Sequence, residues 1–160
     1  MSKGEFAIIG TGEVPTGNYP ERSEFEIAYE VARLAIQDSG IDKDEIGAVL
    51  CAQHIMSNPD NEYNTEMVFG RLPEAIGAKN CKITCMTSAG GASSFAIRKT
   101  AEGVLRSGET DTLLVVHAQR FSQFTPNEQA EYFSIAGSDV EWGVPYGMTY
   151  NSLAAMITQG

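Results

Sequence analysis

The chain has 160 residues, of which 42% are hydrophobic and 20% are charged, a composition typical of an ordinary globular domain. Its formal net charge of −10 argues against a nucleic-acid partner, because Lys and Arg supply most of the affinity for phosphate backbones. No apolar run approaches the roughly 20 residues that a membrane-spanning helix needs, and no secretory signal pattern opens the chain, so we predict a cytoplasmic protein without membrane insertion.

Strand-like and helical segments alternate along most of the chain. Short apolar runs predict buried strands at residues 6–10, 47–52, 81–87 and 111–119. Helices are expected at residues 23–40, around 67–72, at 91–107 and at 149–159, and residues 120–145 read as irregular. Apolar strands that alternate with helices predict the α/β class, with a mostly parallel sheet covered by helices on both faces.

The first of these helices has the clearest local signals. Ser23 and Glu26 have capping-box spacing, and Gly40 follows the last apolar position of the helix. The chain as a whole divides into an α/β core over residues 1–119 and a second region over 120–160. Because the last helix is short and follows a long connection, we expect the fold to continue in further sequence.

The cysteines and histidines do not form a recognisable metal site. Cys51, Cys81 and Cys85 match neither a disulfide framework nor zinc-ligand spacing, and two histidines are too few for a metal centre. We therefore expect free thiols, no metal and no bound cofactor.

The strongest candidate site is the stretch KITCMTSAGGASSFAI at residues 82–97. It runs from a strand through a turn at Gly90 and Gly91 into a helix, whose N-terminal N–H groups can stabilise a thiolate or an oxyanion. This geometry favours acyl chemistry. The alternative is that the small residues only let the helix pack closely on the sheet or on a second subunit.

Four stretches together resemble the N-terminal half of the thiolase superfamily, closest to its sterol-carrier and lipid-transfer-protein branch. They are AIIGTGEVPTG, IAYEVARLAIQDSGIDKDEIGAVL, GGASSFAIRKTAEGVLRSGETDTLLVVHAQR and VPYGMTYNSLAAM. In that family the nucleophilic cysteine opens the third helix. Counting back from Gly108 puts its place at Gly91, so the resemblance implies that the nucleophile is replaced by glycine and that only the Gly91 backbone N–H remains.

Other residues near this position are candidates for the missing role. Cys85 lies six residues before Gly91, within a predicted strand, and is interpreted as a buried thiol, with catalysis as the alternative. Ser88, Ser93 and Ser94 are interpreted as helix caps that lack a base. His117 is interpreted as a core histidine, with an acid–base role as the alternative.

The resemblance also implies a substrate and partners. The substrate would be an acyl-CoA thioester, contacted by Gly90, Ser93 and Met148. Further candidates for an acyl tunnel, each with core packing or a subunit interface as the alternative role, are Met67, Phe121, Phe124, Tyr132 and Phe133. The reaction would make or break a carbon–carbon bond beside the thioester, as an acyltransferase or a retro-aldol lyase. The alternative is a non-catalytic subunit that binds acyl-CoA or supports a thiolase-like complex.

Expected partners are a second copy of the chain, paired through the strand at residues 81–87, a C-terminal thiolase half and a small OB-fold and zinc-ribbon protein.

Overall fold

The computed structural model describes residues 6–52, 68–120, 125–137 and 141–159. It divides into two compact units, Met1–Gln119 and Arg120–Gly160, which are described separately below.

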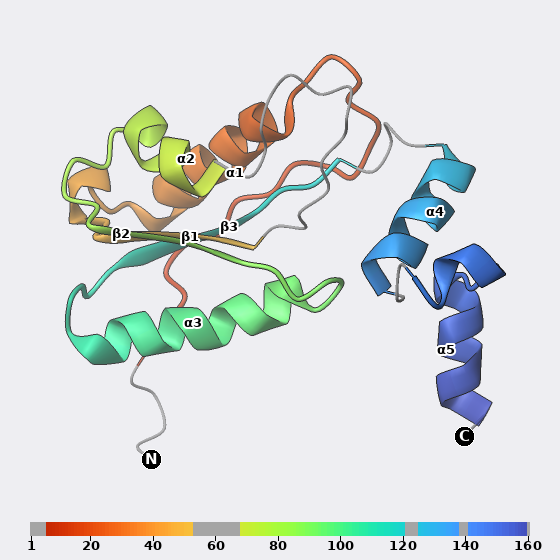
Figure 1. Cartoon of the computed structure of the whole chain (residues 1–160). Coiled ribbons are helices and arrows are strands. Elements are labelled where there is room, and N and C mark those ends of the chain that lie inside the picture. The colour runs from red at the N-terminus through yellow and green to blue at the C-terminus, as the bar shows by residue number, and fades with distance from the viewer. Residues whose placement is uncertain (1–5, 53–67, 121–124, 138–140, 160) are drawn as a thin grey trace. The chain divides into compact units, whose positions relative to one another are not determined.

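A parallel sheet forms the centre of the first unit (Figure 1). Its strands are β1 (Ala48–Ala52), β2 (Ile83–Thr87) and β3 (Leu113–His117), in the order β2-β1-β3. Ala52 is in register with both Thr87 and His117, so all three strands end at the same edge. The side chains and loops that follow the strands therefore gather at this carboxyl edge of the sheet.

Helices cover both faces of the sheet, which confirms the predicted α/β class (Figure 1). Helices α1 (Glu24–Ser39) and α2 (Val68–Ile76) lie on one face, and α3 (Ser93–Ser107) lies on the other. The central strand β1 is buried throughout. Val49 and Cys51 pack toward α1 and α2, whereas Leu50 and Ala52 pack with Ile97 of α3.

The predicted start and end of α1 are confirmed in detail. The Ser23 hydroxyl accepts a hydrogen bond from the Glu26 N–H at 3.1 Å, and the Ser23 N–H donates to the Glu26 carboxylate at 2.7 Å. The bond from the Ser23 N–H, together with one that the Ser23 hydroxyl donates to the same carboxylate at 3.0 Å, lowers the pKa of Glu26. The helix ends at Gly40, whose φ of 69° is readily adopted by glycine. A short 3₁₀ helix, η1 (Lys43–Glu45), then leads into β1.

The prediction of a strand at residues 6–10 is wrong. This segment is irregular, and Ile8 is 88% exposed. The segment instead continues over α1, where a Cβ added at Gly12 would come within 2.2 Å of the Val31 carbonyl oxygen. Gly12 therefore allows close packing of the chain against α1 and has no role in strand pairing.

The second unit contains α4 (Pro126–Gly137), η3 (Val144–Tyr146) and α5 (Tyr150–Gln159). The Tyr150 N–H donates to the Ser134 hydroxyl at 3.3 Å, and the Tyr150 and Phe133 rings lie 5.8 Å apart. These contacts join α5 to α4. The interpretation of residues 120–145 as irregular is therefore wrong for α4. In the described parts of both units, no helix is long and apolar enough to cross a bilayer.

Candidate functional site

A tight turn connects β2 to α3 at the carboxyl edge of the sheet. Gly90 has a φ of 56°, a conformation that favours glycine. The buried Ser93 hydroxyl donates to the Gly90 carbonyl oxygen at 2.7 Å and accepts from the Ala89 N–H at 2.9 Å. Gly90 and Ser93, both predicted substrate contacts, thus have structural roles in shaping this turn. Substrate contact by either residue stays a prediction.

Ser93→Ala is expected to lower the free energy of unfolding by about 1–2 kcal/mol, because it removes two hydrogen bonds made by one buried hydroxyl. Urea denaturation would measure the change. Ser107→Ala is the matched control, since the Ser107 hydroxyl also donates one bond, to the Val104 carbonyl oxygen, and accepts one, from the Glu109 N–H, but is exposed, so water can replace both bonds. An equal effect of the two substitutions would contradict this role for Ser93.

The tip of α3 is open toward solvent. Gly91 is exposed, and a Cβ added to it would meet no other atom within 4 Å. The N-cap residue is Ala92, which has no side chain that could accept a hydrogen bond from the first turn. The positive end of the helix dipole therefore lies beside an unfilled position. This arrangement can receive a carbonyl oxygen or a developing oxyanion.

Ser94 and His117 meet at the same edge. The Ser94 hydroxyl oxygen lies 2.6 Å from Nδ1 of His117, and both side chains are exposed. The interpretation of His117 as a core histidine is therefore wrong. So is the expectation that Ser94 is a helix cap without a base, because Ala92 is the cap and an imidazole lies within hydrogen-bond distance. A hydroxyl and an imidazole at this distance can exchange a proton.

The three cysteines lie away from the helix tip. Cys85 is within β2 and packs toward Leu50 and Ile97 on the α3 face. Burial raises the pKa of Cys85 and of Cys81. Burial, helped by the proximity of Cys85, raises the pKa of Cys51 to about 12. These thiols are therefore poorly ionised at neutral pH, which weakens them as nucleophiles.

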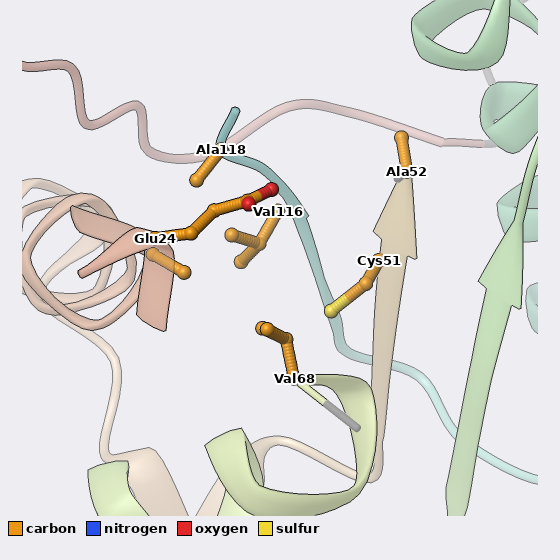
Figure 2. A pocket seen from close by; sticks show the side chains of 7 residues that line it. Glu24, Cys51, Ala52, Val68, Val116 and Ala118 are labelled. Atoms are coloured by element: carbon orange, nitrogen blue, oxygen red, sulfur yellow. The ribbon is translucent and has the colours of Figure 1, made fainter. Parts of the chain in front are cut away.

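Cys51 faces a small pocket on the opposite face of the sheet (Figure 2). Its sulfur points toward the space beside Val68 and Val116, and Glu24 of α1 reaches in from the other side. The volume of about 10 Å³ is close to what one water molecule needs. This pocket is too small for an acyl thioester.

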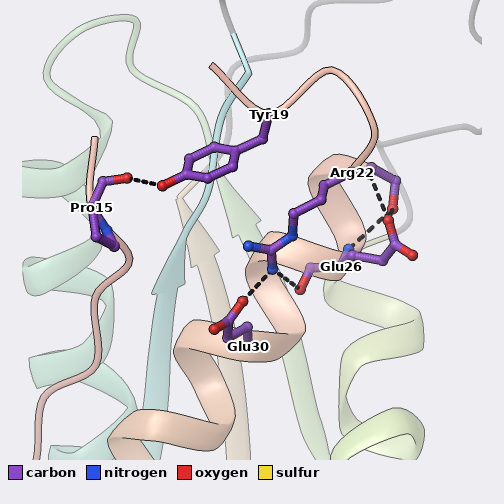
Figure 3. Close-up of polar contacts among 6 residues, drawn as sticks. Pro15, Tyr19, Arg22, Glu26 and Glu30 are labelled. Atoms are coloured by element: carbon purple, nitrogen blue, oxygen red, sulfur yellow. Dashed lines mark hydrogen bonds and ion pairs between the residues drawn. The ribbon is translucent and has the colours of Figure 1, made fainter. Parts of the chain in front are cut away.

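A cluster of polar contacts fixes the loop before α1 (Figure 3). The Tyr19 hydroxyl donates to the Pro15 carbonyl oxygen at 2.5 Å, and the Arg22 guanidinium lies 5.5 Å from the centre of the Tyr19 ring. Arg22 also forms an ion pair with Glu30. Glu24, the first residue of α1, lines the same pocket as Ala52, the last residue of β1. The loop before α1 therefore lies near the carboxyl edge of the sheet.

Substrate contact by the remaining predicted residues stays a prediction. Met148 belongs to the second unit, where its N–H donates to the Gly143 carbonyl oxygen at 3.1 Å. Met67, Phe121 and Phe124 lie outside the described residues.

The chain is similar in sequence or in fold to several known proteins. No protein-family model matches the chain. An acetyl-CoA acetyltransferase of Methanocaldococcus jannaschii is 26% identical over 155 residues, which are 97% of this chain and 38% of that protein. The priming β-ketosynthase of the R1128 polyketide pathway has a TM-score of 0.55 and 22% identity, and the match covers 65% of this chain and 29% of the ketosynthase. The fold is thiolase-like.

A second solved structure has the same thiolase-like fold. The 3-oxoacyl-[acyl-carrier-protein] synthase III of Aquifex aeolicus has a TM-score of 0.51 and 17% identity, covering 64% of this chain and 32% of that one. The chain thus spans between about a quarter and two-fifths of the length of these three proteins. The likeness supports an acyltransferase-type fold.

Proposed function

We propose that this chain is the N-terminal part of a thiolase-like protein that makes or breaks a carbon–carbon bond beside the thioester of an acyl-CoA. The observation that carries the proposal is the open tip of α3 at Gly91, at the edge where all three strands end. The similarity to a protein named acetyl-CoA acetyltransferase supports the choice of a CoA thioester.

In the proposed complex the thioester carbonyl oxygen lies against the first turn of α3. The missing side chain at Gly91 leaves room for it, and the helix dipole stabilises negative charge on that oxygen when the neighbouring carbon becomes an enolate. Retro-aldol cleavage needs only this oxyanion stabilisation and a base. Claisen-type chemistry that proceeds through an acyl-enzyme also needs a group that carries the acyl chain.

A non-catalytic, acyl-CoA-binding subunit is the second candidate function. The observation that favours it is the raised pKa of all three cysteines, since none of them offers an ionised thiol at the helix tip.

The same proposal includes three further parts. The protein would belong to the sterol-carrier and lipid-transfer branch, would act together with a C-terminal thiolase half and an OB-fold partner, and would be cytoplasmic. Self-association through β2 is another part, supported by the position of β2 at the edge of the described sheet.

The test uses the full chain with any partner that co-purifies. Binding of acetyl-CoA and cleavage of 3-hydroxyacyl-CoA are measured for the unchanged protein, for Gly91→Leu and for Gly103→Leu. Gly103 is the matched control because it is an exposed glycine of α3, and a Cβ there also meets open space. We expect Gly91→Leu to weaken binding at least about tenfold, since the added side chain fills the proposed carbonyl position, a change worth about 1.4 kcal/mol.

Gly103→Leu is expected to bind as the unchanged protein does. Binding without any cleaved product would favour the non-catalytic subunit. Absence of binding, or equal binding by both variants, would contradict the proposed position of the thioester.

A further inference from the structure

The Ser94–His117 pair has the geometry of an activated nucleophile. A nucleophilic hydroxyl and its base typically lie about 2.6–3.2 Å apart, and the Ser94 oxygen lies 2.6 Å from Nδ1 of His117. With Nε2 carrying the ring proton, Nδ1 accepts the hydroxyl proton. Because both side chains are exposed, a substrate can reach the hydroxyl oxygen.

The fold brings these two residues together from distant parts of the sequence. Ser94 is the second residue of α3, and His117 is the last residue of β3. Leu113 packs on the α3 side of the sheet, and alternate residues of a strand share a face, so His117 also faces α3. The hydroxyl thus lies in the strand–turn–helix connection, and the base comes from a neighbouring strand.

The hydrogen bonds of the turn separate the roles of the two adjacent serines. Ser93 is buried and holds the turn through Gly90 and Ala89. Ser94 is exposed, and its hydroxyl is directed to the imidazole. Negative charge that develops on the Ser94 oxygen, or on a carbonyl oxygen beside it, is near the positive end of the α3 dipole.

We infer that Ser94 and His117 form a nucleophile–base pair that takes an acyl group from an acyl-CoA thioester as an ester on Ser94. The inference rests on the proposed function for its substrate and supplies the acyl carrier that the Claisen-type reaction needs. The nucleophile is then a hydroxyl and not one of the three thiols, whose raised pKa values make them poor nucleophiles.

The step balances without a further reactant. Nδ1 of His117 takes the hydroxyl proton as the Ser94 oxygen forms a bond to the thioester carbonyl carbon. The carbon–sulfur bond then breaks with its electron pair on sulfur, and the imidazolium returns the proton to that sulfur. The products are the acylated Ser94 and free CoA thiol, and water or an enolate can later take the acyl group from the ester.

The test incubates the full chain, with any co-purifying partner, with acetyl-CoA. Free CoA thiol is followed with a thiol reagent, and the acetyl group is located by peptide mass spectrometry. We expect one acetyl group on the peptide that carries Ser94, or steady release of CoA that depends on Ser94 if the ester hydrolyses quickly. Ser94→Ala should abolish both, and His117→Gln should slow CoA release about 100-fold or more.

Ser107→Ala is the control, because it removes an exposed hydroxyl from the other end of the same helix. Circular dichroism verifies that each variant is folded, and acetyl-CoA binding is measured on the same samples. Bound acetyl-CoA without Ser94-dependent acylation or CoA release would overturn the inference and leave the retro-aldol form of the proposed function in place. Absence of binding would instead remove the proposed function and, with it, this inference.

Discussion

Gly91→Cys is expected to create the most reactive thiol in the described part of the chain. A Cβ at Gly91 meets no atom within 4 Å, so the side chain fits without rearrangement. Helix N-termini lower the pKa of cysteine, so we expect labelling by iodoacetamide at pH 7 to be roughly 2–4 times faster than for an ordinary exposed cysteine. By comparison, Cys51, with a pKa of about 12, has only about one thiolate in 10⁵ at that pH.

Gly103→Cys is the matched control for this experiment. It places a thiol on the same helix, also at an exposed glycine whose added Cβ meets open space, but away from the N-terminal turn. Rates measured from pH 6 to pH 9 should show ionisation at lower pH for the cysteine at residue 91. Identical pH profiles for the two variants would contradict the electrostatic role assigned to the tip of α3.

Elements with strong local signals could be predicted from the sequence. The ends of α1 follow from Ser23, Glu26 and Gly40, because capping bonds and a left-handed glycine depend on only a few neighbouring residues. The end of α3 at Gly108, whose φ is 75°, follows in the same way. Helix α4 has a comparable signal within the segment predicted as irregular: Thr125 and Glu128 exchange capping bonds around Pro126 at the first helical position.

Features that depend on tertiary placement could not be predicted locally. The apolar run at residues 6–10 has a strand-like pattern, but the chain there packs against α1, where Gly10 and Gly12 allow a close approach to the helix. The Ser94–His117 contact joins residues 23 positions apart and depends on where α3 crosses the end of β3. The sequence does contain one indication of this contact. His117 ends an apolar strand, at the edge of the sheet where α3 is predicted to begin.

Leu50→Ala is expected to have the largest effect on stability, about 2–5 kcal/mol, because it leaves a cavity between the sheet and α3. Leu50 is completely buried in β1 and packs with Ile97. Val115→Ala is the matched control: Val115 is in register with Leu50 on β3 but is 42% exposed, so its loss should cost less than about 1 kcal/mol. Urea denaturation of both variants measures the difference. Comparable losses would show that the α3 face of the sheet is not buried as described, and the placement of Ser94 beside His117 would lose its structural basis.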